Sequence, residues 1–182
     1  MTAADRRNLH LKVVEEPTGE GPLCIADLYA AHGAFVAGIA HRITGSAADV
    51  DDIVQDTFLD AERGLSGLRN GAAVRGWLAA IAVRRARRHM RKCRLLRFFG
   101  FERPADFDAV ADRSASPEQR AEVSAIYRLL DGFSVDERIA WTLRYVQGEQ
   151  VSRIAQLCGC SRATIHRRIA VVQTAIQEAS HD

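Results

Sequence analysis

The chain has 182 residues, 47% of them apolar, and its 25 Lys and Arg against 23 Asp and Glu leave a formal net charge of +2. This length supports one domain or two small ones. No apolar run is long enough to span a membrane and none in residues 1–22 could serve as a signal peptide, so we expect a cytoplasmic protein without direct membrane insertion.

The charge is strongly segregated along the chain. Residues 63–101 contain eleven Lys or Arg and no Asp or Glu, whereas the remaining residues carry 14 basic against 23 acidic side chains, a balance of −9. Because acidic residues are absent from this block altogether, we favour a polyanion-binding surface over a merely solvated basic face.

The N-terminal half predicts a flexible tail followed by helices. Residues 1–22 are polar and show no sustained period. From Ile25 to Gly45 apolar residues recur at spacings of three and four, which predicts a first helix. A second helix is expected after Ser46, which has the features of an N-cap, and its apolar stripe consists of Val50, Ile53, Val54, Thr57, Phe58 and Ala61.

The opposite side of this second helix is acidic. Asp49, Asp52, Asp56 and Asp60 follow one another at spacings of three and four, where like charges repel by a few tenths of a kcal/mol per pair. Leu59 projects from the same side as Asp52, Gln55 and Asp56. A large apolar group on a surface that otherwise favours water indicates a protein interface.

A loop over residues 69–76 leads to a third helix that we expect to begin near Trp77. Ala and Val form its apolar stripe, and arginines cover the rest. Residues 98–115 lose the helical period and become acidic, with four phenylalanines among them, so we predict a linker that lies against another surface.

The C-terminal half predicts four helices. Ser116 with Gln119 and Ser134 with Glu137 are capping boxes that begin the first two. Residues 151–158, a turn at Gly159 and a final helix from Ser161 then have the pattern of a helix-turn-helix. Its second helix would place side chains at base edges of the major groove.

The sequence gives little support for an enzyme. No glycine loop for phosphates and no nucleophile with a credible base is present. The four cysteines do not have the spacing of a zinc site, and carboxylates strung along one helix cannot wrap a cation. We therefore expect no catalytic residues, no metal site and no cofactor.

Three segments carry a resemblance to a known family. DVDDIVQDTFLDA (residues 49–61), WLAAIAVRRARRHMRK (77–92) and IAQLCGCSRATIHRRI (154–169) are similar to regions 2.2, 2.3 with 2.4, and 4.2 of the extracytoplasmic-function (ECF) sigma factors, small members of the bacterial sigma-70 family. The resemblance covers about residues 24–180 and implies an all-α fold of two small domains joined by a flexible linker.

The resemblance also implies boundaries and roles. It divides the chain into a tail (1–22), a region 2-like domain (23–97), the acidic linker (98–115) and a region 4-like domain (116–182). A sigma factor binds core RNA polymerase at the beta-prime clamp and beta flap and directs it to promoter DNA. It has no small-molecule substrate and is usually held inactive by an anti-sigma factor.

Residue roles follow on the same resemblance. Polymerase docking falls to Asp49, Asp52, Gln55, Asp56 and Leu59. Contacts with the minus-ten element fall to Arg69, Asn70, Arg75, Arg84, Arg87, Arg88 and Arg91. Contacts with the minus-thirty-five element fall to Ser161, Arg162, Ala163, Thr164, His166, Arg167 and Arg168. Asp60, Glu62, Val74, Arg84 and Arg88 depart from residues common in the family.

Two other functions fit parts of the pattern. A polymerase-independent regulator would dimerise through the N-terminal half and bind a palindrome with half-sites one DNA turn apart. An interaction protein whose basic helix binds RNA or an anionic membrane would bind without sequence preference. Transcription with purified core polymerase separates both from a sigma factor.

Overall fold

The structure, a computed structural model, describes residues 24–67, 73–101, 107 and 115–179, and every regular element within them is a helix, as predicted. The N-terminal elements are α1 (Ile25–Thr44), η1 (Ala47–Asp49), α2 (Val50–Gly64), η2 (Leu65–Gly67) and α3 (Val74–Phe98). The C-terminal elements are α4 (Pro117–Asp131), α5 (Val135–Tyr145), α6 (Val151–Cys158) and α7 (Arg162–Ala179).

The helices α1, α2 and α3 pack around the apolar stripes that the sequence predicts. In α2 the stripe is buried as expected, except that Val50 is only partly covered. The Thr57 hydroxyl donates a hydrogen bond of 2.7 Å to the carbonyl of Ile53, so this polar atom is satisfied inside the core. The acidic side of α2 therefore faces outward.

The helix α3 begins earlier than predicted. The loop expected over residues 69–76 ends before Val74, and the helix starts there rather than near Trp77. Val74 is buried in the core, and its burial favours a helical first turn. The sequence does not predict this turn because Gly76 has a low helix propensity.

The helices α4 and α5 begin at the predicted capping boxes, and α6 ends at the predicted turn. Ser116 and Ser134 each accept a hydrogen bond from the backbone N–H three residues on, and both capping boxes are complete. Between α6 and α7, Gly159 has a left-handed conformation with φ of 65°, which glycine adopts without steric cost. The Ser161 hydroxyl accepts from the N–H of Thr164 at 3.1 Å and caps α7.

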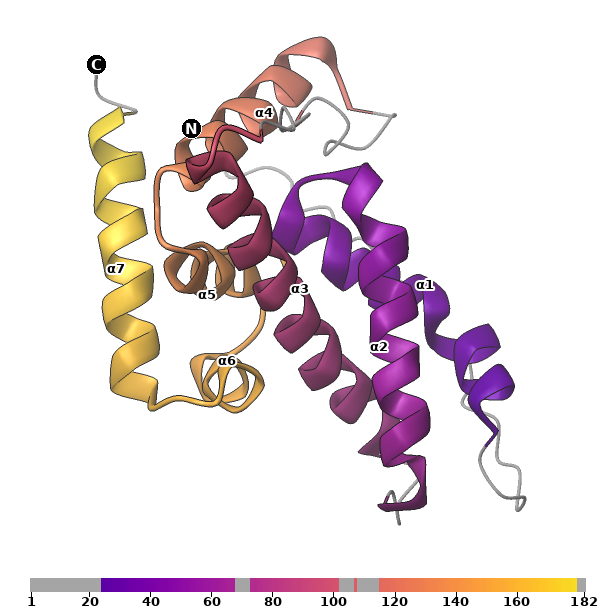
Figure 1. Ribbon diagram of the computed structural model, residues 1–182. Coiled ribbons are helices and arrows are strands. Elements are labelled where there is room, and N and C mark those ends of the chain that lie inside the picture. The colour runs from indigo at the N-terminus through magenta and orange to yellow at the C-terminus, as the bar shows by residue number, and fades with distance from the viewer. Residues whose placement is uncertain (1–23, 68–72, 102–106, 108–114, 180–182) are drawn as a thin grey trace.

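The two groups of helices lie in direct contact, which the sequence does not predict. Figure 1 shows α3 between α2 on one side and α5 and α6 on the other, and α3 contacts all three. The main apolar core is continuous across both groups. The side chains that DNA and polymerase would meet are therefore positioned by packing between the groups as well as within them.

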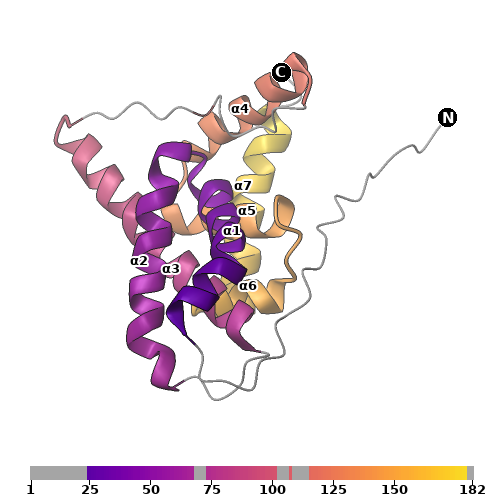
Figure 2. The same cartoon turned by 90° about the vertical axis from the view of Figure 1, so that its right-hand side faces the viewer.

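The predicted linker, residues 98–115, lies mostly outside the described residues. Of its phenylalanines, Phe107 is buried with its ring 6.0 Å from that of Tyr127, as expected for a linker that lies against a surface. Phe98, Phe99 and Phe101 are exposed. They sit at the C-terminal end of α3, which projects beyond the other helices in Figure 2.

Cysteines and hydropathy place further limits on the described part of the chain. Cys158 is buried, Cys93 and Cys160 are partly buried, and Cys24 is exposed. No described helix is both long and apolar enough to cross a membrane. Within the same residues, no three His, Cys, Asp or Glu side chains gather as a metal site would require.

Candidate partner and nucleic-acid interfaces

The acidic face of α2 carries most of the predicted docking residues. Asp52, Gln55 and Asp56 are exposed, and Leu59 leaves 43% of its surface in solvent. Beside Leu59 a groove runs between α1 and α2, lined by Ile25, Ala26, Tyr29, Asp51, Val54, Gln55, Phe58, Leu59 and Glu62. An apolar floor with acidic residues at its edge suits a partner that is apolar at the centre and basic at its rim.

The fifth predicted docking residue lies apart from this groove. Asp49 is half-buried, and its carboxylate lies 3.2 Å from Nε2 of His89 on α3. Asp49 therefore belongs to the contact between η1 and α3 rather than to the exposed face of α2.

Asp60, which departs from the residues common in the family, has a partner in the structure that was not predicted from the sequence. Arg85 on α3 binds the Asp60 carboxylate through two nitrogens and reaches Asp56 at 3.2 Å. The hydrogen bond from Arg85 lowers the pKa of Asp60, and the same bond raises the pKa of Arg85. Asp60 thus joins α2 to α3 and relieves part of the repulsion within the acidic row.

Besides Arg85, which faces α2, arginines of α3 fall into two sets. Arg84 and Arg88 are exposed and free to meet a polyanion, and Arg75 stacks its guanidinium over the ring of Phe35 at 4.2 Å while remaining exposed. Arg69 and Asn70 lie outside the described residues. The second set faces the C-terminal helices.

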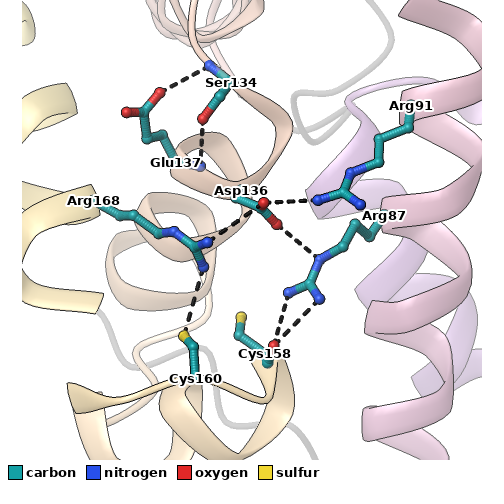
Figure 3. Close-up of polar contacts among 8 residues, drawn as sticks. All are labelled: Arg87, Arg91, Ser134, Asp136, Glu137, Cys158, Cys160 and Arg168. Carbon is teal, nitrogen blue, oxygen red and sulfur yellow. Dashed lines mark hydrogen bonds and ion pairs between the residues drawn. The ribbon is translucent and has the colours of Figure 1, made fainter. Parts of the chain in front are cut away.

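Asp136 on α5 binds three arginines that the family resemblance assigns to DNA (Figure 3). From α3, Arg87 Nε lies 2.9 Å from one carboxylate oxygen and Arg91 Nη2 lies 2.8 Å from the other. From α7, Arg168 Nη2 lies 3.4 Å from the same oxygen as Arg91. The predicted minus-ten and minus-thirty-five surfaces therefore meet at one carboxylate.

Further contacts continue this pattern along α3. Arg87 also donates to the carbonyl of Cys158 at 3.2 Å, which lies beside the turn of the helix-turn-helix. Arg94 donates to the carbonyl of Phe133 at 2.9 Å, and Arg97 binds Asp131. Burial alone would raise the pKa of Asp131, but Arg97 and the other neighbouring arginines lower it.

The C-terminal end of α1 forms a second joint with the C-terminal group. Arg138 is only 3% exposed, donates to the carbonyl of Thr44 and lies 3.1 Å from Asp131. The Tyr127 hydroxyl donates to the carbonyl of Arg42 at 2.6 Å. Helix ends leave such carbonyls without intrahelical partners, so these bonds satisfy α1 while fixing α4 and α5 against it.

The helix α7, which the sequence predicts to be the recognition helix, presents most of its predicted residues outward. Ser161, Arg162, Ala163, His166 and Arg167 are exposed, Thr164 is half-buried, and Arg168 turns toward Asp136 and Cys160. Ile165 and Ile169 on the other side are buried in the core. The exposed set offers guanidinium, hydroxyl and methyl groups, which are the groups that read base edges.

Comparison with known proteins identifies the family. Residues 28–95 match the family model described as Sigma-70 region 2. The chain is 29% identical over 143 residues to the ECF RNA polymerase sigma factor SigM of Mycobacterium tuberculosis, covering 79% of this chain and 70% of the relative. It is 30% identical over 157 residues to the ECF RNA polymerase sigma-E factor of Escherichia coli, covering 78% of each. The chain belongs to the ECF sigma factors.

Two solved structures share the fold of this sigma factor. One is the sigma factor RpoE in complex with the anti-sigma factor NepR from Bartonella quintana, with a TM-score of 0.62, 20% identity and coverage of 84% of this chain and 94% of that one. The other is CnrH in complex with the cytosolic domain of CnrY, with a TM-score of 0.54, 23% identity and coverage of 85% and 88%. The predicted fold class is thus confirmed.

Proposed function

We propose that this ECF sigma factor binds core RNA polymerase through the acidic face of α2 and directs it to promoters through the exposed arginines of α3 and α7. The observation that carries the proposal is the pairing, on adjacent helices, of an acidic face with an exposed leucine and a basic face without acid. The chain acts by binding in the cytoplasm, and the chemistry of transcription belongs to the polymerase.

Polymerase docking centres on Leu59. Its exposed side chain lies beside the groove between α1 and α2, with Asp52 and Gln55 on the same face. An apolar anchor with a charged rim gives affinity at the centre and orientation at the edge. The fitting partner is a basic, partly apolar surface such as the beta-prime clamp.

Leu59→Arg tests this docking surface. Loss of an anchor of this kind costs about 2 kcal/mol, so we expect roughly a 30-fold weaker complex with core polymerase. Leu95→Arg is the matched control, because Leu95 is also an exposed leucine but lies near the far end of α3. Equal affinities of the two variants for core polymerase would contradict the docking assignment.

Promoter recognition rests on α7 for the minus-thirty-five element and on Arg75, Arg84 and Arg88 for the minus-ten element. Arg162 and Arg167 are exposed at the start of α7, where a recognition helix meets bases. Arg167→Ala should cost about 1 to 3 kcal/mol at a cognate promoter if the side chain pairs with guanine. Loss to the same extent on unrelated DNA would assign Arg167 to phosphate instead.

The partners follow the same proposal. The C-terminal helices would contact the beta flap while α7 lies on DNA. Both similar solved structures are complexes of two proteins, CnrH with the cytosolic domain of CnrY and the sigma factor RpoE with the anti-sigma factor NepR. We propose a partner of that class here, for which the product of an adjacent gene is the first candidate. Co-expression that abolished transcription would support it.

A further inference from the structure

We propose that Asp136 is a latch that holds the free sigma factor closed and covers part of its own DNA-binding surface. The carboxylate binds Arg87 and Arg91 of α3 and Arg168 of α7, so it draws side chains from both predicted DNA-binding helices to one point in α5 (Figure 3). This inference rests on the proposed DNA-binding function of those helices.

The latch uses one stripe of the basic helix. Arg87, Arg91, Arg94 and Arg97 succeed one another at spacings of four, three and three, and therefore lie on one side of α3. All four bind the C-terminal group, through Asp136, the carbonyls of Cys158 and Phe133, and Asp131. Arg84 and Arg88 remain exposed on another side. The closed chain thus presents only part of its positive charge to DNA.

The contacts at Asp136 differ in how strongly they hold. The Arg87 Nε and the Asp136 oxygen that it faces lie 2.9 Å apart and are shielded from solvent, but they form an ion pair without hydrogen-bond geometry. The Arg91 side chain is 61% exposed and donates a hydrogen bond of 2.8 Å to the other Asp136 oxygen. A shielded pair loses much when one partner is removed, while an exposed pair is weak and screened by salt. Arg87 therefore contributes a shielded ion pair to the latch, and Arg91 is the arginine that a competing anion reaches first.

A single carboxylate balances only part of the charge that converges on it. Three guanidiniums meet one Asp136, so the cluster keeps a net positive charge and attracts phosphates. DNA phosphates compete with the carboxylate for the same nitrogens, because guanidinium binds both groups in similar geometry. When polymerase brings DNA close to the chain, the DNA would therefore favour an open form, in which α3 no longer binds Asp136, over the closed form.

Closure also restrains the helix-turn-helix. Arg168 is held by Asp136 and by the sulfur of Cys160 at 3.6 Å, and Arg87 holds the carbonyl of Cys158 across the turn. The predicted minus-thirty-five surface of α7 and the predicted minus-ten surface of α3 are thus held at one separation in the closed chain. The contacts of Arg168 lie within the C-terminal group, so binding two separated promoter elements at once requires the contacts of α3 with that group to break.

Asp136→Asn tests the latch in the full-length chain. We expect a larger radius of gyration by small-angle X-ray scattering and, if only about a tenth of the wild-type chain is open, roughly tenfold tighter binding to a short random duplex by fluorescence anisotropy. Glu118→Gln is the matched control: Glu118 holds the equivalent second position of α4, also after a capping box, and is exposed. It removes the same charge near a helix N-terminus.

Arg91→Glu provides a second opening variant if Asp136→Asn does not fold. The position is exposed on α3, and a carboxylate there would repel Asp136. Its readout is scattering alone, since Arg91 is itself a predicted DNA contact. Expansion by either variant but not by Glu118→Gln supports the latch. An unchanged radius for every folded variant overturns it.

The measurement of duplex binding tests the latch separately from the proposed sigma function. Expansion without a gain in duplex affinity beyond that of Glu118→Gln overturns the claim that closure covers a DNA-binding surface. Transcription by wild-type chain with core polymerase is read independently, so failure of the sigma function is visible whatever the latch does.

Discussion

Gly45 reports on whether α4 packs against the end of α1. It caps α1 with φ of 65°, and a methyl group added there would collide with the Tyr127 ring and press on Phe107. Alanine in the left-handed region costs about 1 to 2 kcal/mol, and overpacking a tight contact costs about 1 to 3 more. We therefore expect Gly45→Ala to lower the free energy of unfolding by about 3 kcal/mol, or roughly 10 °C in Tm.

Gly159→Ala separates the two contributions. Gly159 has the same φ of 65°, but a methyl group there would meet no atom within 4 Å, so only the left-handed cost of about 1 to 2 kcal/mol applies. Urea unfolding of both variants measures the difference directly. If Gly45→Ala costs no more than Gly159→Ala, Tyr127 does not pack on Gly45 and the described joint between α1 and α4 is wrong.

Three further predictions concern the polar contacts. Arg138→Met should cost roughly 3 kcal/mol in urea unfolding, because it breaks a buried charge contact with Asp131. Burial raises the pKa of Tyr127 to about 12 from 10.0, so the stability that Tyr127 contributes is complete below pH 10 and is lost as the pH rises toward 12; Tyr127→Phe should remove this loss from thermal melts. Asp60→Asn should cost less than about 1 kcal/mol by urea unfolding, since the pair with Arg85 is partly exposed.

Much of the fold could be predicted because its signals are local. The capping boxes at Ser116 and Ser134, the turn at Gly159 and the apolar stripe of α2 depend on residues three or four apart. The same local rule placed Leu59 on the acidic face. The local rule was wrong at the start of α3. The helix begins at Val74, before the predicted residue, because Val74 is buried in the core.

The pairing of the arginines could not be predicted, because it depends on the rotation of α3 against its neighbours. Arg84, Arg85, Arg87 and Arg88 look alike in the sequence, yet Arg85 meets Asp60, Arg87 meets Asp136, and the other two face solvent. These partners lie 25 and 49 residues away along the chain, and only tertiary packing brings them together. The family resemblance assigned Arg84, Arg87 and Arg88 alike to the minus-ten element, whereas in the structure Arg87 binds Asp136 and the other two face solvent.

Because the two groups of helices are in contact, a carboxylate of the sigma factor itself competes with DNA for its arginines. Arg87 and Arg168 both bind the carboxylate of Asp136 in the closed chain. Each is also a predicted contact with a different promoter element. Since a conformational shift requires a ligand that favours one state, polymerase and promoter DNA together would supply the difference. Closure thereby limits DNA binding by the free chain.

Transcription by purified core RNA polymerase on genomic DNA fragments shows whether this chain acts as a sigma factor. We expect new transcription start sites that appear only when this chain is added. Leu59→Arg should strongly reduce transcription from these sites, whereas Leu95→Arg, on another exposed leucine, should leave it in place. No chain-dependent start site, or equal transcription with both variants, would contradict the proposed function.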